Sequence, residues 1–255
     1  MNKRKIALLA MSACMIAILA IGGTLAYFTD NDAQLNTFTV GNVEIDLFED
    51  FGDNEDNVEH LVPSTMERDE NGKVPNGIDK EVYVENTGSE PAYVRVHIAV
   101  PAILDDGDPT FNAMANTLHW NMPKESVGAD MWNWGTSIGA EGWNAYTTTI
   151  DNVKYNVYVA TYGTALEKGD VTEDAIHQVY LDAKVTNKSI AGIKEVLGEN
   201  WKIYVVAEGG QAAGDNFTDA FDALNTQFGV PGTYTPNFKA DSEGKTFVST
   251  QGVKD

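Results

Sequence analysis

The sequence predicts a mainly β protein, an antiparallel jelly roll or β-sandwich with a few short helices and long loops, preceded by an N-terminal signal helix. Three observations support this fold class. Apolar and polar residues alternate in several short segments, turn residues such as Gly, Asn and Pro separate these segments, and helical spacing is confined to short stretches. Alternation with a period of two directs one face of a segment into a core, which is typical of antiparallel strands.

The N-terminus has the three-part layout of a secretory signal peptide. Residues 2–5 are a positively charged start, and residues 6–21 are an uninterrupted run of apolar and small residues. Small residues then favour cleavage between Ala26 and Tyr27. We therefore predict a signal peptide that is removed and a single domain over residues 27–255. A permanent membrane anchor is the alternative, but the apolar run is short for a bilayer, which requires about 20 residues.

Charge and cysteine content limit the possible partners. The formal net charge is −21, and the basic residues of the signal peptide make the remaining chain more acidic still. Binding to nucleic acid or to an anionic membrane requires clusters of Lys and Arg, so we expect neither partner. Cys14 is the single cysteine and lies in the signal peptide, so disulfides do not hold the secreted chain together.

Strand signals begin after the N-terminal segment. Residues 43–47 and 80–85 alternate in the manner of half-buried strands, and an acidic loop over residues 49–79 separates them. The clearest strand covers residues 94–100, where valines and an isoleucine point to one face and polar residues to the other. Pro101 ends this strand because proline cannot donate a hydrogen bond to a sheet.

The second half of the chain combines strands with two short amphipathic helices. Ser189 is the expected N-cap of the first helix and Gly198 its end. Gly229 and Pro231 end the second helix. The predicted elements are strands over residues 155–162, 176–185, 201–207 and 246–249, and helices over residues 190–197 and 217–228.

Residues 102–152 are the least regular part and form a Trp-rich insertion. Phe111, Met114 and Leu118 have helical spacing and predict a short helix. We interpret the tryptophans as residues that cap the end of the sandwich or belong to a hairpin. The alternative is an exposed aromatic surface for sugars or a protein partner, because aromatic rings combine a large apolar face with a polar edge. The tryptophans of this segment are Trp120, Trp132, Trp134 and Trp143.

Signatures of catalysis are weak. The histidines are scattered and no His-Glu-x-x-His motif occurs, which excludes a helix-borne zinc pair. His97 and His177 fall in predicted strands, and we expect them at the surface or at a sheet edge. Residues 135–139 match the Gly-x-Ser-x-Gly nucleophile elbow, but the buried strand and the helix that an elbow requires are missing. We therefore predict no catalytic residue and a protein that is not an enzyme.

Acidic runs raise the question of a bound cation. Residues 53–56 and 105–108 offer carboxylates, which are the oxygen ligands that calcium accepts. Neither run has the alternating register and the bidentate glutamate of an EF-hand loop. We predict no metal ligand and no cofactor, with calcium as the one alternative.

Several segments in order resemble a known family. The signal junction at residues 22–30 (GGTLAYFTD), the first strand at residues 36–43 (NTFTVGNV) and the segment at residues 84–96 (VENTGSEPAYVRV) resemble the TasA/camelysin family of Gram-positive secreted proteins. Residues 205–228 are similar to a later segment of that family. The resemblance covers most of the chain after the signal peptide, and the Trp-rich insertion is the main part that it leaves out.

The resemblance implies a fold and a function. It implies cleavage by a signal peptidase of the SipW type, a jelly roll, and a role as a fibre subunit of the cell surface or biofilm matrix. In fibre-forming members the mature N-terminus completes the sheet of the next subunit. Carried to this chain, the assembly strand is residues 27–38, with apolar contacts from Tyr27, Phe28, Leu35 and Phe38.

The same resemblance sets the expected partners and the alternatives. The partners are the signal peptidase, further copies of the chain, and components of the matrix or cell wall. The camelysin side of the family is described as metallopeptidase, so a secreted metalloprotease is one alternative, although the chain has no recognisable zinc motif to inherit. A glycan- or surface-binding module that uses the Trp-rich insertion is the other.

Overall fold

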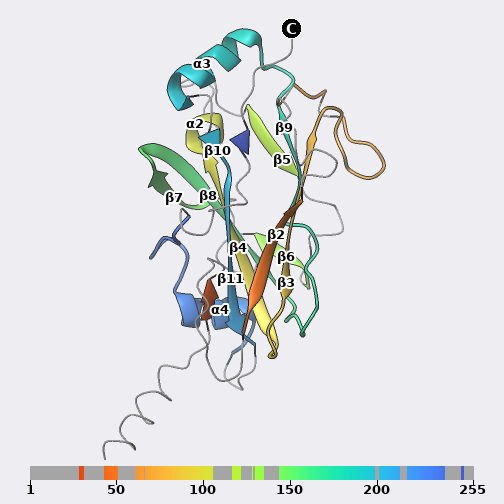
Figure 1. The fold of residues 1–255 in the computed structure, drawn as a ribbon, viewed down its shortest axis with the longest axis vertical. Coiled ribbons are helices and arrows are strands. Elements are labelled where there is room, and N and C mark those ends of the chain that lie inside the picture. Colours follow the sequence, from red (N-terminus) through yellow and green to blue (C-terminus); the bar gives the residue numbers. More distant parts are fainter. Residues whose placement is uncertain are drawn as a thin grey trace, which may run out of the picture.

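Most of the chain folds as two facing antiparallel sheets (Figure 1). This arrangement, in a computed structural model, confirms the predicted mainly β sandwich with few short helices. The predicted signal peptide and several other segments lie outside the described residues. The structure describes residues 29–31, 43–50, 61, 63–65, 67–105, 117–121, 128, 130–134, 144–198, 201–212, 217–238 and 248–249.

The larger sheet has β4 near its centre. Its strands are β1 (Thr29–Asn31), β4 (Ala92–Pro101), β6 (Trp132–Trp134), β7 (Asn144–Ile150), β8 (Val153–Tyr162) and β11 (Tyr204–Gln211). Among the described residues these strands form a six-stranded sheet in the order β1-β11-β4-β8-β6, and β7 also pairs with β8. The strands β6 and β7 share one edge of β8, because β6 pairs with its second half and β7 with its first half. All of these pairs are antiparallel.

The smaller sheet packs against the first. It has the order β2-β3-β9-β5 in the described part of the chain. The strands β10 (Trp201–Lys202) and β12 (Val248–Ser249) form a separate pair, so a strand at the C-terminal end of the predicted range 246–249 does form. The four strands of the smaller sheet are β2 (Ile45–Asp50), β3 (Ile78–Asn86), β5 (Leu118–Asn121) and β9 (Ile176–Leu181).

In the described part of the chain, three short helices flank the sheets: α2 (Ala102–Asp105), α3 (Asn187–Leu197) and α4 (Ala220–Phe228). Within the described residues, no helix is long and apolar enough to cross a membrane. The N-cap of α3 is Thr186 and not Ser189, so the prediction was wrong by one turn. Ser189 is the third helical residue and completes a capping box with Thr186. Gly198 follows the last turn as predicted.

Other element boundaries also differ from the sequence prediction. Leu118 belongs to β5 and not to a helix, and residues 106–116 lie outside the described residues. The strand predicted over residues 176–185 ends at Leu181, because a turn follows. The range 201–207 contains two strands, β10 and β11, and α4 begins three residues after Phe217.

The larger sheet is buried on both faces. Val94, Val96 and Ile98 of β4 are fully buried in the main core between the sheets, as the alternation predicts. On the opposite face a second apolar cluster forms, which includes Val159 and Val206. His97 also lies on this second face and is fully buried. The expectation that His97 lies at the surface or at a sheet edge was therefore wrong, because α4 and the segment after it cover this face.

Candidate functional site

Part of the predicted assembly segment forms the edge of the larger sheet. Strand β1 pairs antiparallel with β11, which in turn pairs with β4 along its whole length. The predicted apolar contacts Tyr27, Phe28, Leu35 and Phe38, and the cleavage residue Ala26, lie outside the described residues. The pairs between β1 and β11 are Thr29 with Gly210, Asp30 with Gly209, and Asn31 with Glu208.

Two glycines of β11 that pair with β1 pack closely against the rest of the domain. A Cβ atom on Gly209 would lie 2.7 Å from Cγ2 of Ile45, which belongs to the smaller sheet. A Cβ atom on Gly210 would lie 3.0 Å from the amide of Gln227 on α4. Gln227 also accepts a hydrogen bond from the backbone N–H of Gln211 and donates one to its carbonyl oxygen. The end of β11 is therefore clamped between the smaller sheet and α4.

A buried ion pair fixes β11 to β4 beside this edge. Nε of Arg95 on β4 donates to Oε2 of Glu208 on β11, and both side chains are almost completely buried. The other guanidinium nitrogens donate to Oδ1 of Asn225 (2.9 Å) and to the carbonyl oxygen of Gly229 (3.0 Å). The hydroxyl of Tyr234 accepts from Arg95 and donates to Glu208. Each group in the pair thus has a partner, as a buried charge requires.

His97 extends this arrangement. Its Nε2 lies 3.1 Å from Oε2 of Glu208, and its Nδ1 lies 3.0 Å from the hydroxyl of Tyr146. An ionised carboxylate only accepts hydrogen bonds, so we assign the hydrogen to Nε2 and let Nδ1 accept from Tyr146. We call this group the buried network, and its residues are Arg95, His97, Tyr146, Glu208 and Tyr234.

The environment fixes the charges of the buried network. Burial alone would raise the pKa of Glu208, but contacts with His97, Arg95 and Tyr234 outweigh it and lower the pKa to about 2. Burial lowers the pKa of His97 despite the hydrogen bond to Glu208, so the imidazole is neutral at pH 7. Arg95 and Glu208 are therefore the two charges of the network. Because Arg95, His97 and Glu208 are buried and bond to one another or to other groups of the fold, we assign the network a structural role that holds β11 in place.

The tryptophans lie at different depths. Trp132 on β6 is fully buried and donates to the carbonyl oxygen of Glu173 (2.7 Å). Trp120 on β5 and Trp134 on β6 are half-buried, and their ring centroids are 5.0 Å apart. They join the edges of the two sheets, which agrees with tryptophans that cap the sandwich. Trp143 lies outside the described residues. Of the predicted aromatic residues that the structure describes, Trp120 and Trp134 are partly exposed, and the aromatic binding surface stays a prediction.

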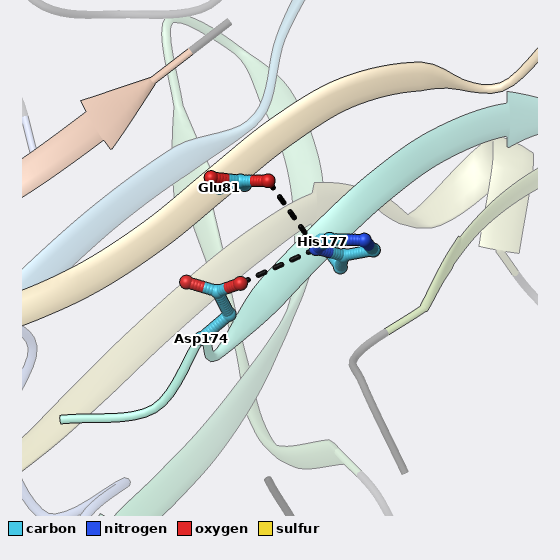
Figure 2. Close-up of side chains that lie close together, drawn as sticks. All are labelled: Glu81, Asp174 and His177. Atoms are coloured by element: carbon cyan, nitrogen blue, oxygen red, sulfur yellow. Dashed lines mark hydrogen bonds and ion pairs between the residues drawn. The ribbon is translucent and has the colours of Figure 1, made fainter. Parts of the chain in front are cut away.

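A second group of titratable side chains lies on the smaller sheet (Figure 2). Nδ1 of His177 on β9 lies 3.2 Å from Oδ2 of Asp174 and 3.6 Å from Oε1 of Glu81 on β3. The three ligand atoms lie within 4.8 Å of one another. Figure 2 shows both carboxylates directed to the same nitrogen of the ring. We call Glu81, Asp174 and His177 the surface cluster.

A β-bulge positions the surface cluster. Asp79 pairs with Gln178, and Val82 pairs with Ile176, so two residues of β3 lie opposite His177 alone. One of the two, Lys80, points inward and is fully buried, whereas the other is Glu81, which is half-buried. Bulges commonly redirect a side chain in this way. The extra residue therefore brings Glu81 to the imidazole.

The electrostatics of the surface cluster differ from those of the buried network. Burial and the negative charge of Glu81 raise the pKa of Asp174, although the hydrogen bond with His177 opposes this shift. The ammonium group of Lys73 is influenced by Glu81, but its hydrogen bond goes to Asp79 (2.9 Å). Two carboxylates therefore share one imidazole, and this arrangement can attract a cation.

Sequence reasoning did not find the surface cluster. It placed His177 at the surface or at a sheet edge. The ring is 13% exposed, and β9 is an inner strand between β3 and β5. The spacing of Asp174 and His177 was visible, but nothing in the sequence links them to Glu81, because the register and the bulge make that contact.

The acidic runs and the nucleophile elbow gain no support. Oδ2 of Asp105 accepts hydrogen bonds from Asn156 (2.8 Å) and Tyr158 (2.6 Å) within the fold. Residues 53–56, 106–108 and 135–139 lie outside the described residues. The calcium alternative stays a prediction.

The N-terminal part of the chain is similar to a known family. Residues 1–89 match the family model described as camelysin metallo-endopeptidase. This match confirms the resemblance over the N-terminal part, which includes β1, β2 and β3. No curated protein and no solved structure matches the chain. Of the surface cluster, only Glu81 lies within the range that matches the camelysin family.

Proposed function

We propose that the protein is a secreted structural protein of the cell surface or biofilm matrix, a fibre subunit that assembles by adding its N-terminal strand to the sheet of a neighbouring copy. The match to the camelysin family model over residues 1–89 supports the proposal that the chain is a member of a secreted-protein family. In this proposal a signal peptidase of the SipW type releases the chain before assembly, and the role of the protein is structural rather than enzymatic.

The observation that carries the proposal is the pairing of β1 with β11. The three residues of β1 lie within the predicted assembly segment and form one edge of the larger sheet. A short edge strand contributes mainly backbone hydrogen bonds, and the same segment of another copy can supply these equally well. The strand can therefore complete its own sheet in a monomer and a neighbour's sheet in a fibre.

The construction of β11 supports this exchange. The buried network and the contacts of Gln227 fix the strand from the side of α4. The close approach of Gly209 to Ile45 fixes it from the smaller sheet. An acceptor strand that is held by its own domain stays in place when the donor strand leaves, which keeps the cost of exchange low.

The test is a backbone substitution in β1. Proline cannot donate to a sheet ladder, so we expect Asp30→Pro to abolish fibres and to leave a soluble, folded domain. Asp30→Asn is the matched control, because it keeps the backbone N–H, and it should form fibres at the level of the unmodified protein. Negative-stain electron microscopy and sedimentation measure the fibres, and circular dichroism measures the fold.

A deletion extends the test to the whole segment. A secreted chain without residues 27–38 should remain monomeric, and a synthetic peptide of residues 27–38 should bind it with 1:1 stoichiometry. Equal fibre yield from the truncated and the complete chain would contradict the proposal.

The second candidate function is a metallopeptidase, which the description of the matching family favours. Such an activity implies a bound metal. Among the described residues, Glu81, Asp174 and His177 are the one group of three His or carboxylate side chains placed closely enough to hold it. An imidazole and two carboxylates are a donor set that zinc accepts. Cleavage of casein that a chelator stops, and that His177→Gln removes, would favour this function over the structural one.

A further inference from the structure

We propose that the surface cluster is a binding site for a divalent transition-metal ion of the zinc class, with Glu81, Asp174 and His177 as its protein ligands. The site lies on the smaller sheet, at β3 and the beginning of β9 (Figure 2), whereas β1 belongs to the larger sheet. It would link β3 to β9 at the bulge. The proposal does not depend on fibre formation.

The spacing of the donor atoms fits such an ion. Tetrahedral zinc holds its nitrogen and oxygen ligands at about 2.0–2.2 Å, which places neighbouring ligand atoms about 3.4 Å apart. Nδ1 of His177 lies 3.2 Å from the Asp174 oxygen and 3.6 Å from the Glu81 oxygen. All three donor atoms lie within 4.8 Å of one another, so small rotations of the carboxylates bring them into the coordination shell.

The type of donor selects the metal. Calcium and magnesium prefer shells made entirely of oxygen, whereas an imidazole nitrogen favours zinc and its neighbours in the first transition row. The charge also fits, because two carboxylates and a neutral imidazole balance a divalent cation. Three protein ligands leave a fourth position for water.

The fold presents these donors on a rigid support. The bulge between β3 and β9 positions Glu81, His177 lies in β9, and Asp174 lies just before this strand, three residues from His177. The side chains are 37%, 20% and 13% exposed for Glu81, Asp174 and His177, so the site is open enough for an ion to enter. Asp174 and His177 lie outside the residues that match the camelysin family model.

A comparison within the smaller sheet shows why three donors matter. His119 on β5 lies 2.9 Å from Asp182 and stacks on the ring of Tyr180. This pair has one carboxylate, and it is not among the groups of three donors found in the described residues. His119 is therefore a matched control on the same sheet.

The experiment measures zinc binding to the secreted chain without a histidine tag, after removal of metal with a chelator. We expect isothermal titration with ZnCl₂ to give one site, with binding weakened at least tenfold in each of Glu81→Gln, Asp174→Asn and His177→Gln. His119→Gln should bind zinc as tightly as the unmodified protein. In the Co²⁺ complex, we expect visible absorption bands of a tetrahedral nitrogen–oxygen site, and these bands should be lost in His177→Gln.

The proposal fails if no zinc binds at micromolar concentration. It also fails if binding survives all three substitutions, because the ion would then lie elsewhere, or if His119→Gln weakens binding as much as His177→Gln. A preference for calcium over zinc in competition would contradict the assignment of the metal. Circular dichroism of each variant verifies that the fold is retained.

Discussion

The buried network and the surface cluster combine the same kinds of side chain, histidine and carboxylate, in opposite environments. In the buried network, Arg95 and Glu208 are almost fully buried, and their hydrogen bonds go to other groups of the fold. In the surface cluster two carboxylates share one partly exposed imidazole. In the buried network the charges of Arg95 and Glu208 balance each other away from water. The surface cluster is partly exposed, and its two carboxylates give it excess negative charge.

This difference indicates that the role of a histidine–carboxylate group depends on its burial and on the number of its bonding partners, and not on residue type alone. A buried charge that loses its partner is strongly unfavourable, so the buried network ties β4, β11 and α4 into one unit. Contacts of partly exposed charged side chains contribute less to folding, because water competes for the charges. We therefore expect the buried network to stabilise the position of β11, and the surface cluster to bind an ion without a large contribution to stability.

We expect the largest loss of stability from a substitution that breaks the ion pair of the buried network. Glu208→Gln leaves the buried guanidinium of Arg95 without its counter-charge, and we expect the free energy of unfolding to fall by about 3–5 kcal/mol. Glu167→Gln is the control, because Glu167 is exposed, and it should change stability by less than about 0.5 kcal/mol. Urea denaturation measures both. A loss for Glu208→Gln that is no larger than for Glu167→Gln would show that the network does not hold the fold together.

The next effect is the response of the buried network to acid. In the folded protein the carboxyl group of Glu208 has a pKa of about 2, below the ordinary value of 4.5. A depressed folded pKa gives stability that is present above pH 4.5 and lost as the pH falls towards 2, and this amounts to about 3 kcal/mol. His97 acts in the same direction, because its lowered pKa costs stability as the pH falls below about 6.5.

Variants separate these two contributions. We expect Glu208→Gln to remove the loss of stability between pH 4.5 and 2, and His97→Gln to remove the earlier loss below pH 6.5. Urea denaturation at a series of pH values measures the slopes. Identical slopes in the unmodified protein and in both variants would contradict this account.

The sequence predicted much of the fold, because period-two alternation reports which side of a strand meets a core. The strands β3, β4 and β8 follow from it directly. The alternation did not predict that the second face of β4 is also buried. Arg95 and His97 occupy polar positions, and only the packing of α4, which lies far along the chain, makes that face part of the interior.

The candidate sites show the same limit. The assembly segment was predicted from a family resemblance, and β1 lies within it. The surface cluster was not predicted, because Glu81 and His177 meet only through the register of β3 and β9 and through one extra residue in β3. A bulge has no reliable signature in a single sequence, since it depends on how two distant strands pair.

We expect the smallest loss of stability from a substitution in the surface cluster when no metal is bound. In metal-free protein the imidazole of His177 contacts only two carboxylates that are themselves partly exposed, so we expect His177→Gln to lower the free energy of unfolding by less than about 1 kcal/mol. Urea denaturation in the presence of a chelator measures this value, and His119→Gln on the same sheet should give a similarly small one. A loss as large as that of Glu208→Gln would mean that the surface cluster holds β3 to β9 by itself, and the contrast with the buried network would disappear.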